Sequence, residues 1–156
     1  MSADYLAIML NDHLAGATAG VELARRTSAS NRDEPEFGPP LEELQGEIEA
    51  DRATLEQVMA AAGAGRDQLK LAAGWVAEKL GRLKPNGQLR GYSPLSRVVE
   101  LEGLVLGITG KLRLWSLLAE REDQALRGFD FAALAERATE QRRTAERLQS
   151  AAAGRL

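Results

Sequence analysis

Apolar residues recur along this chain at helical spacing, and the strict alternation of a half-buried β-strand is nearly absent. One stripe of three- and four-residue spacing consists of Leu41, Leu44, Ile48, Leu55, Val58 and Ala62. The same spacing predicts five helices, over about 3–27, 41–62, 67–83, 94–122 and 131–152. Four of these are long, and the third is shorter.

Breaks in the pattern separate the predicted helices. The segment 28–40 holds three prolines and a glycine and is expected to be a loop, and the glycines of 63–65 end the second helix. Segment 84–92 is a further loop, after which Ser93 is the expected N-cap, while Asp130 caps the last helix. Two long helices, a central connection with one short helix and two more long helices predict one all-α domain, 1–156. Its expected architecture is an up-and-down four-helix bundle with an extra short helix in the long crossover.

An internal repeat supports this connectivity. The sequence that starts at Asp51, DRATLEQV, resembles the sequence that starts at Gln141, QRRTAERL, at an offset of 141 − 51 = 90. The same offset relates Asp12 to Glu102 and Gly20 to Gly110. One constant offset over both helix pairs predicts two helical hairpins related by duplication, with chance similarity between helices rich in Ala, Arg and Glu as the alternative.

Composition narrows the classes of function. The chain has no cysteine, which excludes disulfides, thiolate metal sites and cysteine nucleophiles, and its net charge is −3 with both signs mixed throughout. Asp4 near the start does not suit a secretory signal, and the longest strongly apolar stretch, 104–108, is too short to span a membrane. We expect a cytoplasmic protein that does not bind membranes and has no global attraction to nucleic acid.

The segment 47–59, EIEADRATLEQVM, resembles the second bundle helix of the ferritin-like superfamily, most closely that of its small bacterial stress-associated members. The resemblance implies a ferritin-like bundle. Metal-binding members carry one Glu on each of two helices and a Glu-x-x-His pair on each of the other two. These side chains hold two iron or manganese ions at the centre of the bundle.

The ligand pattern of that family is degenerate in this chain. The core register places Ile48 and Asp51 at the Glu and His positions of the second helix, and Ala138 and Gln141 at those of the last helix. A second register, with Glu49 and Arg52 or with Glu140 and Arg143, supplies arginine in place of histidine. Asp12 and Glu102 can stand for the two single glutamates, and His13 is the only histidine of the chain. Because these ligand positions are degenerate, we expect no resident cofactor and no conventional dimetal site. A divergent carboxylate-rich metal site of Asp12, His13, Asp51 and Glu102 is the alternative.

Polar residues interrupt the apolar stripes at Asp51 and Gln141. Because buried charges need partners, we expect a layer in which Arg52 and Arg142 pair with them and fix the register of the helices. A remnant functional site is the other interpretation. The full expected layer consists of Asp12, His13, Asp51, Arg52, Glu102, Gln141 and Arg142.

Glycines lie near the same level on two helices, namely Gly16, Gly20, Gly107 and Gly110. Glycine inside a helix costs about 1 kcal/mol relative to alanine, so we expect a compensating gain. The expected gain is room, either for close helix approach or for a large side chain such as arginine or glutamine. A cofactor cavity is the less favoured interpretation. Trp75 and Trp115 have apolar neighbours and are expected to pack in the core or an interface.

The crossover holds the one basic patch of the chain, which consists of Lys79, Arg82, Lys84, Arg90 and Arg97 around Tyr92. It suggests an ordinary solvated connection, and the alternative is a contact with phosphate, RNA or an acidic partner. The leading functional hypothesis is a non-enzymatic bundle with a structural or binding role, and the alternatives are the divergent metal site and a phospholigand or RNA-binding module.

We also expect a homodimer, because the helix 94–122 has more apolar surface than one bundle can cover, and the excess needs either a partner or the crossover helix. On this helix the expected core stripe is Leu95, Val98, Val105 and Leu112. The residues expected to lie beside that stripe are Leu101, Leu104, Ile108, Trp115 and Leu118.

Overall fold

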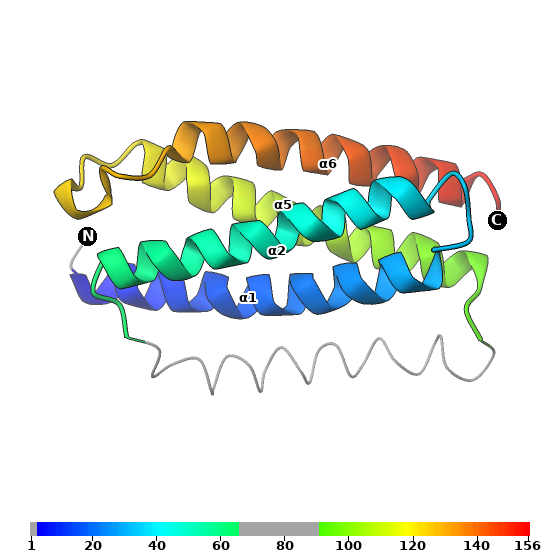
Figure 1. Ribbon diagram of the computed structural model, residues 1–156, viewed down its shortest axis with the longest axis horizontal. Helices are drawn as coiled ribbons and strands as arrows, with labels where there is room; N and C mark the ends of the chain where they lie inside the picture. The colour runs from blue at the N-terminus through cyan, green and yellow to red at the C-terminus, as the bar shows by residue number, and fades with distance from the viewer. Residues whose placement is uncertain (1–2, 66–90) are drawn as a thin grey trace.

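The computed structural model of the chain describes residues 3–65 and 91–156 (Figure 1). Its helices are α1 (Ala3–Ser30), α2 (Gly38–Ala61), α5 (Pro94–Ala119) and α6 (Phe131–Ala153), with a 3₁₀ turn, η1 (Gln124–Leu126), before α6. No strand occurs within these two ranges. The predicted all-α class is therefore confirmed, whereas the short helix predicted over 67–83 lies outside the described residues.

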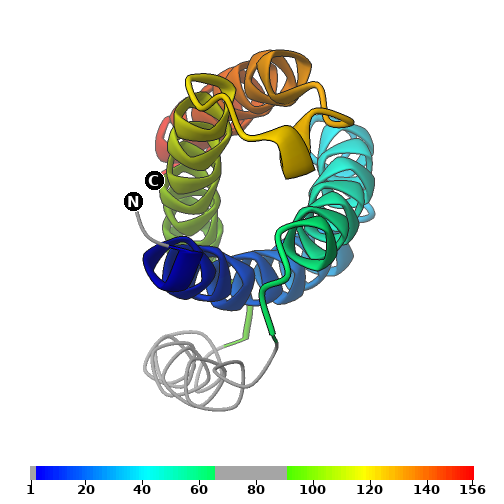
Figure 2. The ribbon, with the colours of Figure 1, turned by 90° about the vertical axis from the view of Figure 1, so that its left-hand side faces the viewer.

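Figure 2 shows the four long helices as a ring in the order α1, α2, α6, α5. Helices α1 and α2 form one hairpin and α5 and α6 form the other, and α1 packs against α5. The contact between α2 and α6 is much sparser. Helices α2 and α5 occupy opposite corners of the ring, so a side chain that joins them must cross the interior. None of the helices in the described ranges is both long and apolar enough to cross a membrane.

Helix boundaries differ from the sequence prediction mainly at the first loop. Helix α1 continues to Ser30, and α2 begins at Gly38, before the two prolines that were expected to belong to the loop. Proline fits this position because the first turn of a helix has no intrahelical acceptor for its N–H groups. The N-caps Ser93 and Asp130 are confirmed, since the Ser93 side chain accepts from the Ser96 N–H and that of Asp130 from the Ala133 N–H.

The core face of α5 is not the one predicted. Leu95 is 57% exposed, and the other three residues of the predicted stripe are only partly buried. The buried residues are those expected beside it, namely Leu101, Leu104, Ile108, Trp115 and Leu118. Because α5 is apolar on several faces, its periodicity alone does not select the side that meets the other helices.

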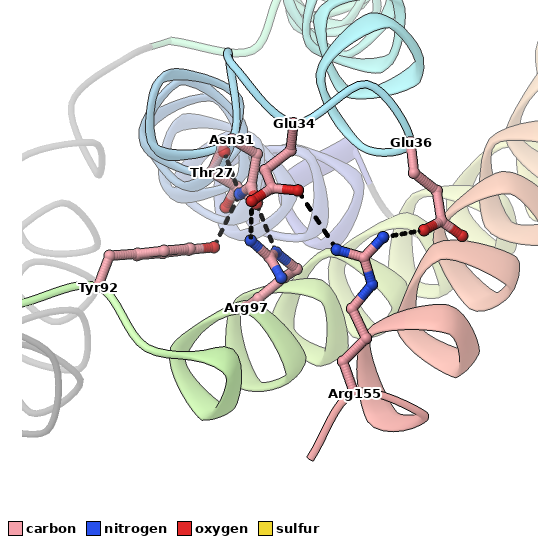
Figure 3. Close-up of polar contacts among 7 residues, drawn as sticks. All are labelled: Thr27, Asn31, Glu34, Glu36, Tyr92, Arg97 and Arg155. Atoms are coloured by element: carbon pink, nitrogen blue, oxygen red, sulfur yellow. Dashed lines mark hydrogen bonds and ion pairs between the residues drawn. The ribbon is translucent and has the colours of Figure 1, made fainter.

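Arg97 organises the end of the bundle where the α1–α2 loop meets the start of α5 (Figure 3). Its guanidinium donates to Asn31 Oδ1 at 2.5 Å and lies 4.5 Å from the centre of the Phe37 ring. Asn31 in turn donates to the Tyr92 hydroxyl, and Arg155 near the C-terminus is paired with Glu34 and Glu36. Arg97 is only 8% exposed. The sequence assigns it to a basic patch that is either a solvated connection or a phosphate contact, but Arg97 is buried, with its Nε bonded to Asn31 and its guanidinium 3.7 Å from Glu34.

Contacts between α2 and α6 follow the offset of 90 found in the sequence. Asp51 and Gln141, which are 90 residues apart, are hydrogen-bonded at 3.0 Å. Glu47 contacts Gln141, and Asp51 contacts Arg137. These two contacts are images of each other, because 47 + 90 = 137 and 141 − 90 = 51. These contacts agree with the offset of the repeat, and antiparallel packing of α2 and α6 gives the same pairs.

Candidate functional site

A cavity of about 320 Å³ lies between α1, α2 and α5. Five glycines belong to its wall, Gly16 and Gly20 from α1 and Gly103, Gly107 and Gly110 from α5. Half of the other lining residues are apolar, and those with a polar group are Asp12, His13, Asp51, Arg52, Lys111 and Trp115. Gly16 and Gly107 are themselves exposed, so the cavity reaches the surface between α1 and α5. Its size is at the lower end of the roughly 300–1,000 Å³ of small-molecule sites.

The glycines on α1 and α5 create space rather than close packing. A Cβ atom built at Gly16, Gly20, Gly107 or Gly110 meets no described atom within 4 Å. Gly103 is the exception, because its Cβ would lie 2.8 Å from Leu23 Cδ2. Close approach of the helices therefore explains one of the five. The four open positions correct the sequence interpretation, which favoured close packing or a large side chain over a cavity.

A buried polar network lies at one wall of the cavity. Lys111 Nζ donates to Asp51 Oδ2 at 2.6 Å and to Gln141 Oε1 at 2.5 Å. Arg137 donates to the other oxygen of Asp51, whose side chain is 2% exposed. Lys111 thus crosses the ring from α5 to the opposite corner. Burial lowers the pKa of Lys111, and the Asp51 carboxylate acts against that shift.

The polar layer differs from the one expected from sequence in its members and its pairs. Asp51 and Gln141 are buried, but Asp12 and Glu102 are exposed. Arg52 and Arg142, the expected partners, lie 3.8 Å from Glu56 and Glu146 on their own helices. Both arginines stay at the half-buried edge of their helices because a residue next to a core position points about 100° away from it.

The sequence does not identify three members of the polar network, Lys111, Arg137 and Glu47. Lys111 occupies a core position in the spacing 101, 104, 108, 111, 115, 118 of α5. A single lysine in that run is the available signal, but the sequence prediction places another stripe of α5 in the core, and this choice hides it. Arg137 and Glu47 could not be identified in this way, since both lie at half-buried positions on helices rich in charge.

The remaining site predictions fall in different parts of the structure. The four carboxylate and imidazole groups of the alternative metal site do not come together, and the described ranges contain no cluster of three potential ligands from His, Asp and Glu. His13 lines the cavity and is half-buried. In the basic patch, Lys79, Arg82, Lys84 and Arg90 lie outside the described residues, as does Trp75.

Comparisons with protein-family models, with curated proteins and with solved structures give no match to this chain.

His13 provides a test of the cavity wall in solution. Burial lowers its pKa below the ordinary 6.5, against a smaller opposing effect of Asp12. The unfolded chain therefore binds a proton near pH 6.5 that the folded chain resists, so folding loses stability as the pH falls through this region. We predict that the unfolding free energy of the wild type drops relative to that of His13→Gln between about pH 7.5 and pH 5.

Chemical denaturation of both proteins at each pH measures this difference directly. The variant is the matched control, because it keeps all the carboxylates that also titrate in acid. Equal losses in the two proteins would contradict burial of the imidazole, as would a His13 pKa at or above 6.5 in an NMR titration.

Proposed function

We propose that this protein is a non-enzymatic, ferritin-like bundle that holds a small, mainly apolar ligand in the cavity between α1, α2 and α5. The observation that carries the proposal is the set of four glycines at which a Cβ atom would meet no described atom. Each costs the helix about 1 kcal/mol relative to alanine. Contact between the helices does not offset that cost at these four glycines. The space that the glycines leave therefore needs an explanation, and a bound ligand provides one.

A binding role is favoured over catalysis because the ionisable groups at the cavity wall are already engaged. Asp51 accepts hydrogen bonds on both oxygens, from Lys111 and Gln141 on one and from Arg137 on the other. A carboxylate in this state is a poor general base, since both of its oxygens already accept hydrogen bonds from protein donors. Lys111 is held as a donor by two acceptors and so is a poor nucleophile.

The ferritin-like assignment is supported by contacts between α2 and α6 that agree with the offset of the repeat and by the burial of Ile48, Asp51, Ala138 and Gln141. These are the positions at which the family resemblance places metal ligands. Lys111 brings a fixed ammonium between Asp51 and Gln141, and such a charge repels a metal cation. The divergent metal site has less support, because Asp12 and Glu102 are exposed. Within the described residues, the burial of Arg97 also weakens the RNA-binding alternative.

A homodimer is part of the proposal, and it uses the outer face of α5. Leu95, Val99, Leu106 and Leu117 are 57%, 37%, 68% and 40% exposed. They lie within about 40° of one another around the helix, at 100° per residue. Two antiparallel copies of α5 centred on Leu106 bring Leu95 opposite Leu117, since 95 + 117 = 2 × 106. The exposed Glu102 and Arg113 share this face, and in that pairing opposite charges of the two copies come within about one turn.

The ligand cavity is tested by filling it. Gly107→Leu places a side chain in open space, so we expect the variant to fold with stability close to that of the wild type and to lose binding of naphthalene. Gly46→Leu is the matched control, because its Cβ also meets no described atom but Gly46 does not line the cavity. Isothermal titration with naphthalene measures both. Binding that survives in Gly107→Leu, or no binding to the wild type, would contradict the cavity as a ligand site.

Smaller substitutions test the packing argument independently of any ligand. Gly107→Ala should stabilise the fold by about 0.5–1 kcal/mol, because alanine favours a helix and meets no contact. Gly103→Ala should gain less or lose stability, since its Cβ would lie 2.8 Å from Leu23 Cδ2. Denaturant midpoints at constant slope give the comparison.

The dimer is tested with Leu106→Arg, which places two like charges at the proposed symmetry axis. We expect sedimentation of the wild type at tens of micromolar to show a dimer and that of the variant a monomer. Leu156→Arg, at an exposed leucine outside α5, should stay dimeric. A wild type that sediments as a monomer would rule out the interface.

We also predict that the protein has no dimetal centre, because Ile48, Asp51, Ala138 and Gln141 occupy the expected ligand positions. Anaerobic addition of ferrous ion followed by air should give no stoichiometric uptake and no oxo-bridged absorption. Conversely, a variant with Ile48→Glu, Asp51→His, Ala138→Glu, Gln141→His and Lys111→Met should gain metal affinity, because it restores the ligands and removes the competing ammonium. Two equivalents of iron bound tightly by the wild type would contradict the prediction, and a folded variant without affinity would contradict the placement of the ligand positions.

A further inference from the structure

In the most deeply buried part of the cavity wall, the hydrogen-bonding groups without a partner are donors. Trp115 lines the cavity and is 1% exposed, and its indole N–H has no hydrogen-bond partner within the described residues. The same holds for the buried Nε of Arg52, another lining residue. Lys111 has three N–H groups, of which Asp51 and Gln141 take two. Trp115 and Arg52, which line the cavity from two helices, thus each carry a buried donor without a partner, and Lys111 carries one N–H group beyond its two acceptors.

The acceptors of the buried wall are, by contrast, used. Both oxygens of Asp51 accept hydrogen bonds, and the side-chain oxygen of Gln141 accepts from Lys111. The two N–H groups of Gln141 go to Asp51 and Glu47, so this amide has no donor left. Asp12 is the one further carboxylate that lines the cavity, and it is exposed. What the buried part of the wall can still satisfy is therefore an acceptor.

The imbalance concerns hydrogen bonds more than net charge. Asp51 with Lys111 and Arg137 sums to +1, and Glu47, which is reached through Gln141, brings the group to zero. A buried donor without an acceptor costs about 1–3 kcal/mol, so a ligand that supplies the acceptor removes a penalty that the empty wall carries. A ligand with only donors adds a second unsatisfied group beside the first.

We infer that the ligand joins an apolar body to one hydrogen-bond-accepting head group, a carboxylate or a carbonyl, which lies near Trp115 and Lys111. This inference rests on the proposed function, because it assigns the polar end of a ligand held in the same cavity. The apolar body lies along the glycines of α1 and α5, where bare backbone gives a smooth wall. The same arrangement disfavours a ligand with an ammonium head, because the buried part of the wall offers it no open acceptor.

The head group is tested with four probes that share one ring system. Isothermal titration compares 2-naphthoate, methyl 2-naphthoate, 2-ethylnaphthalene and 2-naphthylmethylammonium at a pH near neutrality and at fixed salt. We expect both acceptor-bearing probes to bind at least about fivefold more tightly than the hydrocarbon, the difference of one hydrogen bond. The ammonium probe should bind more weakly than the hydrocarbon.

Trp115→Phe assigns the donor. The substitution keeps an aromatic ring in the wall and removes the N–H, so it should weaken binding of 2-naphthoate by about fivefold and leave that of 2-ethylnaphthalene almost unchanged. In the wild type, the Trp115 indole N–H resonance, identified by its loss in the variant, should move downfield with 2-naphthoate and much less with the hydrocarbon. This readout does not require the variant to fold as stably as the wild type.

The outcomes separate the two levels of the proposal. If no probe binds the wild type, the proposed ligand-binding function fails. If the hydrocarbon binds as tightly as the acceptor-bearing probes, or the ammonium binds most tightly, the cavity is a ligand site but the inference about its head group is wrong. An indole N–H signal that is unmoved by bound 2-naphthoate would remove Trp115 from the recognition of the head group.

Discussion

The buried carboxylate of Asp51 is the constraint on which the rest of this bundle depends. An isolated charge in the interior costs several kcal/mol, so Asp51 has to be met by cations and donors from other helices. Lys111 comes from α5 at the opposite corner of the ring, and Arg137 and Gln141 come from α6. One carboxylate thereby fixes the relative positions of three helices. The sparse contact between α2 and α6 is tolerable because this cluster of charge-assisted bonds joins them.

The same cluster explains how a cavity can persist beside it. Four glycines remove side chains from the contact between α1 and α5, and a wholly apolar core tends to relax toward such a space. A shift of α5 would pull Lys111 away from Asp51 and Gln141 and leave a buried charge without its partners. The penalty for that loss resists collapse. The polar cross-bridge and the glycine wall are therefore two parts of one arrangement, in which the bridge holds open the space that the glycines create.

The sequence was sufficient to predict the helical class, the long helices and the caps Ser93 and Asp130, because periodicity and capping are local properties. It also located Asp51, Gln141 and the glycines, since each departs from its surroundings. The pairing of Asp51 could not be predicted, because Arg52 and Lys111 are both plausible partners until the angular position of each helix is known. On α5 that position was ambiguous: its apolar residues cover more than one face, and the choice of Leu95 over Leu101 as a core residue concealed Lys111. The exposure of Asp12 and Glu102 could not be predicted for the same reason, because it depends on the rotation of each helix about its own axis.

Lys111 links the two levels of organisation, since it belongs both to the bridge and to the cavity wall. Burial lowers its pKa, so the charged form is maintained by Asp51 and Gln141 rather than by water. An acceptor on a ligand adds a third partner to the same ammonium and favours its charged form further. In the proposed complex, ligand binding would then strengthen the contact that joins α5 to α2 and α6. By linkage, loosening this contact must weaken ligand binding by the same coupling free energy. A ligand with an accepting head would therefore not only fill the cavity but also tighten the bundle around it.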